Sequence, residues 1–537
     1  MTTTSAVLAA VTGSSVTQVF GVMGNGNALF IDALRIPFIP LRHEAGAVAA
    51  ADAHARVTGG LGIATTTFGA GFTNSLTALA DAVRARSSLV IVTGDAPTTG
   101  MRAADVDIPA LAIGVGATSW TIEPGHEAST IRAAIESARG SSVPAVVSVP
   151  YDLDASAADL TDAPPARLAE SRGVLPSHII ETILGSKELL LLAGRGAVIS
   201  GAGELARRFA VDQYAATATT VMAHGMFGDY ARHLGIAGGF GSGGAARAMR
   251  AADVVVVLGA GLNAHTTRNG TLFAPPTVII QVDTGRPSPL ATHHVRLDVS
   301  DFLRLLLEAV PNPPRYLPRP PDPRDLAATH VPGGDRMLHP QLLAAEIARQ
   351  LPVESTIVLD GGNFMAWPLQ SWPVRSADAF VPAGLAVQSI GLGLPALIGA
   401  GLAKPDRFPV LAVGDGGLLM ALADLESAAR LLEHGLIVVF NDSAYGAELH
   451  QYGPQGLDTG PMRFPTTDFA ALATAVGMTS ATIRHEDDLV ALADWLRNGP
   501  EGVMLLDCRI ADDVAAPFLA AVTRQRQAAV RPTIEAP

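Results

Sequence analysis

The stretch FPVLAVGDG at residues 408–416, followed after an amphipathic segment by LIVVFND at 436–442, decides the fold of this chain. The first run predicts a buried strand that ends in a tight turn over 414–416. Apolar residues in 418–434 recur at helical spacing, and the second run predicts another buried strand. A strand, a helix and a strand in this order place both strand ends at one edge of a parallel sheet, where such sheets bind ligands.

The acidic residues of these two runs, Asp415 and Asp442, are therefore expected to lie close together. Magnesium prefers hard oxygen ligands, so both carboxylates, the backbone carbonyl of Ala444 and the oxygens of a diphosphate would complete its shell. Gly414 and Gly416 would let the backbone approach the phosphates. The glycines and the first aspartate also suit a plain turn after a strand, and this alternative stays open for the tripeptide alone. The second aspartate favours a site for a magnesium diphosphate.

Four segments of the last third accompany this pattern: Gly391–Ala400, Lys404–Arg407, Gly414–Gly416 and Asn441–Gly446. Together they resemble the diphosphate-binding domain of the thiamine diphosphate enzymes typified by acetolactate synthase, benzoylformate decarboxylase and pyruvate decarboxylase. Many members of that family carry Asn where Asp442 stands, and Asp is an oxygen ligand too. The resemblance implies thiamine diphosphate and Mg2+ as cofactors. It also places Ile390 beneath the cofactor, where relatives hold a bulky apolar side chain. Tyr445 is expected to line the cofactor pocket, and aromatic packing is the alternative.

Segments of the first third match the other half of such a site: Val19–Asn27, Arg42–Ala47, Ala53–Arg56 and Phe68–Asn74. In order and spacing they resemble the family's pyrimidine-binding domain. The resemblance implies that the carboxyl of Glu44 bonds N1′ of the aminopyrimidine and favours the imino tautomer, which removes the thiazolium C2 proton. Asn74 is expected beside it in the cofactor site. Taken alone, Glu44 is also an ordinary first-turn acid of a helix, favourable against the helix dipole.

Residues on the substrate side match the family less closely. Ala104-Asp105 falls where acetolactate synthases carry Gln-Glu, and the paired histidines of pyruvate decarboxylases are absent. Asn25 stands near a polar or acidic group of other members, so we expect it in the catalytic site. Glu448, six residues after Asp442, fits an acid with which the decarboxylases protonate or orient the intermediate. A solvated helix glutamate is the alternative for Glu448.

The middle of the chain has apolar runs at 189–193, 253–258 and 277–283, which predict strands followed by turns of a doubly wound sheet. In acetolactate synthases the equivalent domain binds FAD. Their Arg-Phe-Asp-Asp stretch is replaced here by Gly261–His265, which argues against FAD without excluding it. His265 lies near the place where some decarboxylases present a catalytic histidine, and a loop histidine without a role is the alternative.

Length and pattern predict the architecture. A chain of 537 residues is too long for one core, and β-branched runs that alternate with Ala/Leu-rich segments indicate an α/β fold. We expect three doubly wound parallel-sheet domains: a pyrimidine-binding domain at 1–165, a central one at 175–325 and a diphosphate-binding one at 338–525. Proline-rich linkers fall at 162–166 and 311–323, and the tail 526–537 is expected to be disordered.

Charge and cysteine content exclude several classes of function. The net charge of −13, without a basic stripe, argues against a nucleic-acid partner. The single cysteine, Cys508, excludes an intrachain disulfide, and its apolar neighbours predict a buried strand residue. We find no signal-like leader and no apolar stretch of membrane-spanning length. We therefore expect a cytoplasmic protein without membrane contact.

The resemblance implies a specific activity and assembly. We expect a thiamine diphosphate- and Mg2+-dependent carboligase that decarboxylates 2-oxo acids, like the acetolactate synthases. A non-ligating 2-oxo acid decarboxylase or an aldehyde lyase is the alternative, and a catalytically silent binding or scaffolding relative is a more distant one. In this family the two half-sites come from different subunits, so we expect a homodimer or homotetramer with active sites between subunits.

Overall fold

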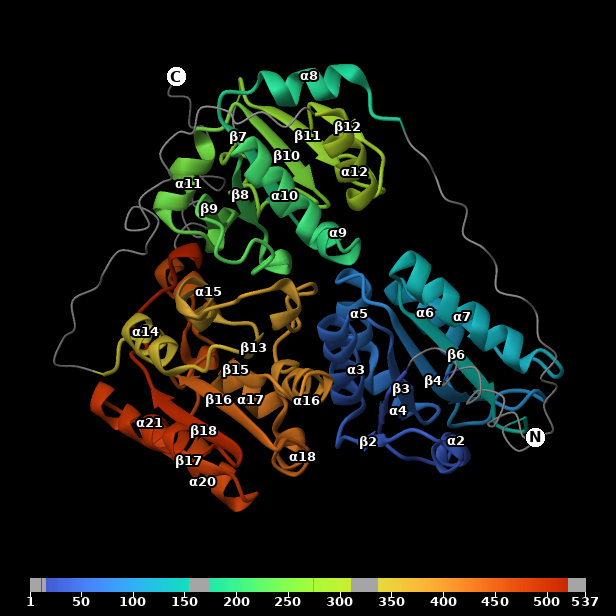
Figure 1. Cartoon of the computed structure of the whole chain (residues 1–537). Coiled ribbons are helices and arrows are strands. Elements are labelled where there is room, and N and C mark those ends of the chain that lie inside the picture. The colour runs from blue at the N-terminus through green and yellow to red at the C-terminus, as the bar shows by residue number, and fades with distance from the viewer. Residues whose placement is uncertain (1–10, 12–15, 154–173, 274, 311–336, 520–537) are drawn as a thin grey trace, which may run out of the picture.

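The computed structural model describes residue 11 and residues 16–153, 174–273, 275–310 and 337–519. Three six-stranded sheets follow one another along this part of the chain (Figure 1). All strand pairs within them are parallel. Helices cover both faces of each sheet, as parallel sheets require. The predicted α/β class with three doubly wound sheets is confirmed.

The first sheet has the strand order β2-β1-β3-β4-β6-β5. Its strands are β1 (Val19–Gly21), β2 (Phe38–Pro40), β3 (Gly62–Thr66), β4 (Leu89–Asp95), β5 (Thr118–Thr121) and β6 (Ala145–Pro150). Its helices are α2 (Ala28–Ala33), α3 (Glu44–Thr58), α4 (Ala70–Asn74), α5 (Leu76–Arg84), α6 (Ile108–Val115) and α7 (Glu127–Ser141). The order reverses between β1 and β3, so the loops after these two strands flank a crevice at the carboxyl edge.

The central sheet has the order β12-β11-β10-β7-β8-β9. Its strands are β7 (Leu189–Ala193), β8 (Ala216–Thr219), β9 (His233–Ile236), β10 (Val254–Leu258), β11 (Val278–Val282) and β12 (His293–Val295). Its helices are α8 (Ser177–Gly185), α9 (Arg195–Ile199), α10 (Gly203–Gln213), α11 (Gly243–Arg250) and α12 (Val299–Ala309). The three apolar runs predicted as strands are β7, β10 and β11.

The third sheet has the order β14-β13-β15-β16-β18-β17, which repeats the order of the first sheet along the chain. Its strands are β13 (Ser355–Leu359), β14 (Phe380–Pro382), β15 (Phe408–Gly414), β16 (His434–Asn441), β17 (Thr479–Ile483) and β18 (Gly502–Arg509). Its helices are α14 (Pro340–Gln350), α15 (Ala366–Ser371), α16 (Gly393–Ala403), α17 (Asp415–Met420), α18 (Leu425–Leu431), α19 (Gly446–Tyr452), α20 (Phe469–Ala475) and α21 (Val490–Arg497).

Two local predictions in the third domain are wrong. The segment 414–416 forms no turn, because β15 runs directly into α17. The helix expected over 418–434 is interrupted by a 3-10 turn at Leu422–Asp424. There the carboxylate of Asp424 accepts a hydrogen bond of 2.7 Å from the backbone N–H of Arg42 in the first domain. A contact between domains thus overrides the local helical pattern.

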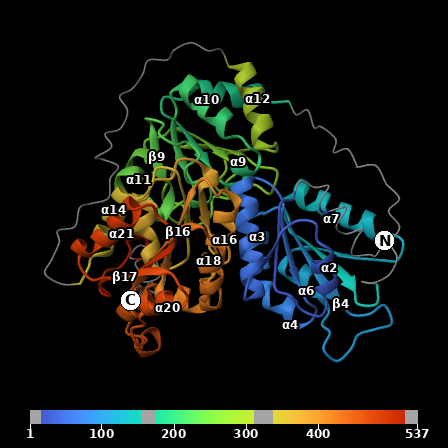
Figure 2. The same ribbon diagram turned by 60° about the horizontal axis from the view of Figure 1, so that its bottom comes forward.

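The first and third domains share one core. Helix α3 packs against α16, and the two helices lie side by side in both views (Figures 1 and 2). Their approach is close, since a Cβ on Gly399 would lie 2.0 Å from the carbonyl oxygen of Ala50. The buried carboxylate of Asp81 accepts hydrogen bonds from the backbone N–H groups of Gly384 and Ala386. Apolar side chains of both domains continue through this contact.

The sequence also led to predictions about the linkers, the tail, membrane-spanning helices and Cys508. The linkers at 162–166 and 311–323 and the tail 526–537 lie outside the described residues. Within the described residues, no helix combines the length and apolar character that crossing a bilayer requires. Cys508 is buried in β18, as its apolar neighbours predicted.

Candidate active site

The carboxyl edge of the third sheet brings Asp415 and Asp442 close together. Asp415 opens α17 and accepts hydrogen bonds from the N–H groups of Gly416 at 2.8 Å and Ser443 at 2.7 Å. Asp442 follows β16 and accepts a hydrogen bond of 3.3 Å from the N–H of Ala444. The backbone therefore fixes both carboxylates on one side of the edge.

The electrostatics of this pair favour a cation. Burial raises the pKa of Asp415 to about 6. Burial and the charge of Asp415 raise the pKa of Asp442 to about 8. A divalent cation would offset both charges, and two hard oxygen donors suit Mg2+. The described residues contain no group of three or more His, Cys, Asp or Glu side chains that could hold a metal. The remaining ligands would thus be backbone and diphosphate oxygens.

Glycines leave room around the two aspartates. A Cβ on Gly416 would lie 2.7 Å from Cε1 of Tyr445, and one on Gly446 would lie 2.5 Å from Oδ2 of Asp442. Ser443 adopts a left-handed conformation with φ of 58°, which is uncommon for a residue other than glycine. The loop therefore curls tightly around the carboxylates, and this shape fits a diphosphate held through a metal ion.

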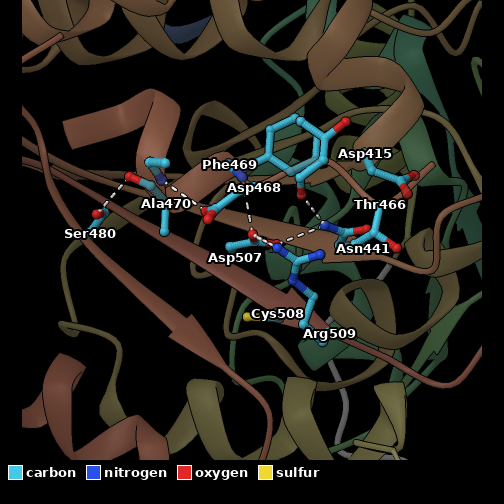
Figure 3. A network of polar contacts seen from close by, with 12 residues as sticks. Asp415, Asn441, Thr466, Asp468, Phe469, Ala470, Ser480, Asp507, Cys508 and Arg509 are labelled. Carbon is cyan, nitrogen blue, oxygen red and sulfur yellow. Dashed lines mark hydrogen bonds and ion pairs between the residues drawn. The ribbon is translucent and has the colours of Figure 1, made fainter. Parts of the chain in front are cut away.

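A polar network behind the edge supports this loop (Figure 3). Asn441, next to Asp442, donates a hydrogen bond of 2.8 Å to Oδ1 of Asp507. The other oxygen of Asp507 accepts bonds from Arg509 at 2.6 Å and from the N–H of Phe469 at 3.1 Å. Burial raises the pKa of Asp507, while Asn441 and Arg509 lower it. The network anchors the end of β16 and thereby positions Asp442.

A cavity of about 1080 Å³ opens in front of the aspartates, between the third and central domains. The predicted site residues that line it are Gly414, Asp415, Gly416, Asp442, Ala444, Tyr445, Glu448, Ile390 and His265. The ring of His265 stacks on Phe240, with ring centres 6.3 Å apart. Glu448 is exposed in the first turn of α19. The fold therefore brings Glu448 and His265 to the same cavity as the aspartate pair.

The loop that carries Ile390 is held by two buried carboxylates. Asp360 accepts a hydrogen bond of 2.9 Å from the N–H of Gly391, and burial raises its pKa to about 7. Asp81 of the first domain accepts one of 2.9 Å from the N–H of Ala386. Sequence reasoning missed both acids, because their partners lie 31 and 305 positions away.

The carboxyl edge of the first sheet carries the other candidate residues. Glu44 opens α3, and its Oε2 accepts a hydrogen bond of 3.0 Å from the side chain of Asn74. Asn25 is exposed in the loop after β1. Neither residue lines the cavity of the third domain, to which the described part of the first domain contributes only Arg84 and Arg86. A single chain thus keeps its two candidate half-sites apart.

Two sheet edges of equal strand order, one with the carboxylates of Asp415 and Asp442 and the other with that of Glu44, point to the class of thiamine diphosphate enzymes. Comparison with known families agrees. The N-terminal TPP binding domain of thiamine pyrophosphate enzymes matches residues 1–110, their central domain matches 177–310 and their C-terminal TPP binding domain matches 360–508. The chain belongs to the thiamine pyrophosphate enzymes, and it is an enzyme that forms or cleaves carbon–carbon bonds.

Full-length relatives show the same relationship. The chain is 27% identical to the probable acetolactate synthase large subunit of Methanocaldococcus jannaschii, over 90% of this chain and 88% of that protein. It is also 27% identical to the acetolactate synthase isozyme 2 large subunit of Escherichia coli K12, over 94% of each. A solved structure with a similar fold is the thiamine diphosphate-dependent 4-hydroxybenzoylformate decarboxylase of Rhodococcus jostii RHA1. It has a TM-score of 0.80 at 22% identity and covers 95% of this chain and 99% of its own.

Proposed function

We propose that this protein is a thiamine diphosphate- and Mg2+-dependent carboligase that decarboxylates 2-oxo acids, similar to the acetolactate synthases. One observation carries the proposal. Asp415 and Asp442 stand at one sheet edge, and Glu44 stands at the corresponding edge of a second sheet with the same strand order. The similarity to two acetolactate synthase large subunits over about the whole chain supports it.

The side chains of the two edges would divide the work. Thiamine diphosphate, when bound, supplies a carbanion for addition to a carbonyl group and accepts the electrons left by a departing carboxylate. Asp415 and Asp442, with the carbonyl of Ala444, would bind Mg2+ and through it the diphosphate. Glu44, oriented by the amide of Asn74, would hold a proton at the aminopyrimidine.

Other residues of the cavity would act on the substrate. Glu448 and His265 stand at its wall, where a carboxyl and an imidazole group could act as general acid or base. Ile390 would support the cofactor from below, and Tyr445 would cover the diphosphate loop near Gly416. Asn25 would reach the site from the other half, at the edge that bears Glu44.

The separation of the half-sites also suggests an assembly. Glu44 and Asn74 bond to each other and do not line the cavity of their own third domain. We therefore propose a homodimer, or a homotetramer made of two such dimers, in which each site combines the first sheet edge of one chain with the third sheet edge of another.

A non-ligating decarboxylase or an aldehyde lyase is the second candidate, and one observation favours it. Ala104 stands where acetolactate synthases carry Gln, so this chain offers no side-chain amide near the reacting carbonyl at that position. The cavity extends to Gly259 and Gly261 of the central domain. The absorbance spectrum of the purified protein would show whether FAD accompanies it there, and the proposal predicts no flavin bands.

The experiment that tests the proposed function measures carbon dioxide release from a panel of 2-oxo acids, with and without acceptor aldehydes or a second 2-oxo acid. Thiamine diphosphate and Mg2+ are added and then withdrawn by chelation. The proposal predicts cofactor-dependent release together with a ligated product. Release without ligation supports the second candidate, and no release from any 2-oxo acid contradicts both decarboxylase proposals.

A further inference from the structure

A second polar cluster lies at the carboxyl edge of the first sheet, and the proposed function leaves it unused. Its members are Phe68 after β3, Arg102 and Asp105 in the loop after β4, and Tyr151 after β6. The guanidinium carbon of Arg102 lies 4.4 Å from the ring centre of Phe68 and 4.7 Å from that of Tyr151. The two rings meet at 86°, so they hold the guanidinium on two sides.

Asp105 fixes the direction in which the guanidinium points. Its oxygens accept hydrogen bonds from Nη2 of Arg102 at 2.8 Å, from Nε at 2.9 Å and from the backbone N–H at 2.7 Å. The side chain of Asp105 is 1% exposed and that of Arg102 is 34% exposed. The Nε–Nη2 edge of the guanidinium is thus occupied, whereas the described residues accept no hydrogen bond from Nη1, which is left available to a ligand. Within the described residues, no second carboxylate pairs with Arg102.

The loop that carries Arg102 is anchored at several points. The N–H of Thr98 donates a hydrogen bond of 2.9 Å to Oδ1 of Asp152. The carbonyl oxygen of Ala104 lies 2.5 Å from the place that a Cβ on Gly69 would take, and the φ of Gly69 is 60°, which glycine adopts without strain. The loop therefore rests directly on the segment after β3. Arg102 is a cation held at a set position rather than a side chain free in solvent.

The position of this cation suggests which part of a ligand it meets. The sheet order reverses between β1 and β3, and open α/β sheets bind ligands at that crevice. Glu44 follows β2 on one side of the crevice, whereas Arg102 lies on the other side, between residues that follow β3 and β6. The strands β2 and β4 are separated by three strand spacings, about 14 Å in all.

We infer that Arg102 is a specificity-determining residue that binds a second carboxylate at the far end of the substrate. The substrate class is then a 2-oxo acid with two acidic groups, and this inference rests on the proposed function. With the reacting carbonyl on the side of Glu44, the chain of the substrate would extend along Phe68 and Tyr151 toward Arg102. Apolar ring faces suit its methylene groups, and the free edge of the guanidinium suits its terminal carboxylate.

The carboxylate lost as carbon dioxide is not the partner of Arg102. A guanidinium on that group would stabilise the bound substrate more than the transition state, in which its charge disappears, and would slow the reaction. Arg102 also lies across the crevice from Glu44, at which the reacting end is expected. A distal carboxylate keeps its charge throughout, so binding it holds the substrate without opposing the chemistry.

The test compares pairs of 2-oxo acids of equal length that end in a carboxylate or in the neutral carboxamide, such as 2-oxoglutarate and 2-oxoadipate with their ω-amides. The ratio of kcat/KM within each pair is measured for the wild type, Arg102→Gln and Arg102→Lys. The wild type should prefer the acid, and Arg102→Gln should lower that ratio by about 10- to 100-fold, mostly through KM. Arg102→Lys keeps the positive charge but lacks the planar pair of donors of a guanidinium. It should therefore restore part of the preference for the acid over the amide.

A matched control and a binding measurement separate the possible failures. Arg304 forms a similar ion pair three residues from Asp301 on the surface of the central domain, and Arg304→Gln should leave the ratio unchanged. Calorimetric titration of the full chain with glutarate and with its monoamide requires no turnover. If the wild type binds glutarate more tightly than the monoamide and Arg102→Gln abolishes this difference, the role of Arg102 is supported. This holds even if no 2-oxo acid reacts, because the lack of any reaction would refute the proposed function alone. An equal loss for acid and amide, or a wild type without preference in either measurement, overturns the role of Arg102.

Discussion

The first and third sheets share one strand order but present opposite environments at their carboxyl edges. At the first edge, Glu44 is partly exposed and accepts a hydrogen bond from the amide of Asn74. At the third edge, Asp415 and Asp442 are enclosed and face each other, and burial raises the pKa of both. One scaffold, used twice, can therefore supply two complementary halves of a site, with chemistry set by loops rather than by the sheet.

Buried titratable groups make the stability of both domains depend on pH. The first domain buries a histidine in its neutral form, because burial lowers the pKa of His54 to about 4. The third domain buries acids, and the pKa of Asp360 is raised to about 7. A falling pH should thus cost stability where it charges His54, whereas a rising pH should cost stability where it charges Asp360.

The largest expected effect concerns the first edge. Glu44→Gln keeps the size of the side chain and removes its proton, so kcat should fall by about 10²- to 10⁴-fold while the unfolding transition stays in place. Steady-state kinetics and thermal unfolding measure the two. Glu204, another acid in the first turn of a helix, is the control, and Glu204→Gln should leave kcat unaltered. Equal effects of the two changes would show that Glu44 acts only on the helix dipole.

The second prediction concerns the buried base of the first domain. His54 has a pKa of about 4 in the folded protein and about 6.5 in the unfolded protein. The contribution of neutral His54 to the free energy of unfolding is therefore complete above pH 6.5 and is lost as the pH falls. Between pH 6.5 and 5 this loss amounts to about 2 kcal/mol. His54→Gln stays neutral and should remove that part of the acid sensitivity. Denaturant unfolding at both pH values measures it, and an identical decline in the variant would contradict the assignment.

The third prediction concerns the acid pair of the third edge. The pKa of Asp442 is raised in the fold, so the cation-free protein loses stability as pH rises from about 4 toward 8. Asp442→Asn removes one of the two facing charges and should stabilise the cation-free protein at pH 8 by about 1–2 kcal/mol. Excess Mg2+ with thiamine diphosphate should reduce this difference. A variant less stable than the wild type at pH 8 without metal would contradict the repulsion between the two carboxylates.

The smallest effect is expected at Ile390, on the loop held by Asp360 and Asp81. Ile390→Ala should lower kcat by about 3- to 10-fold and change the affinity for the cofactor by less than that factor. Proton exchange at C2 of the bound cofactor, followed by NMR, should slow in parallel with kcat. Unchanged exchange together with lower thermal stability would mean that Ile390 only fills space.

Local pattern predicted the parts of this structure that depend on neighbours in the sequence. The buried strands before Asp415 and Asp442 follow from apolar runs, and parallel pairing then brings their ends to one edge. The prediction of a continuous helix over 418–434 was wrong, because Asp424 bonds to Arg42, which lies 382 positions away in the sequence. The supports of the site, such as Asp507 beneath Asn441, were missed for the same reason. Such buried acids carry no sequence signal until the fold supplies their partners.

Each active site is proposed to combine residues of two chains, and mixing two inactive variants tests this most directly. Glu44→Gln chains and Asp415→Ala chains are unfolded together, refolded with thiamine diphosphate and Mg2+, and assayed for carbon dioxide release. Random pairing leaves one intact site in each hybrid dimer, so about one quarter of the wild-type activity should return. If hybrids form, as shown by tagged chains, and activity stays at the level of the separate variants, each site lies within one chain, which contradicts the shared-site proposal.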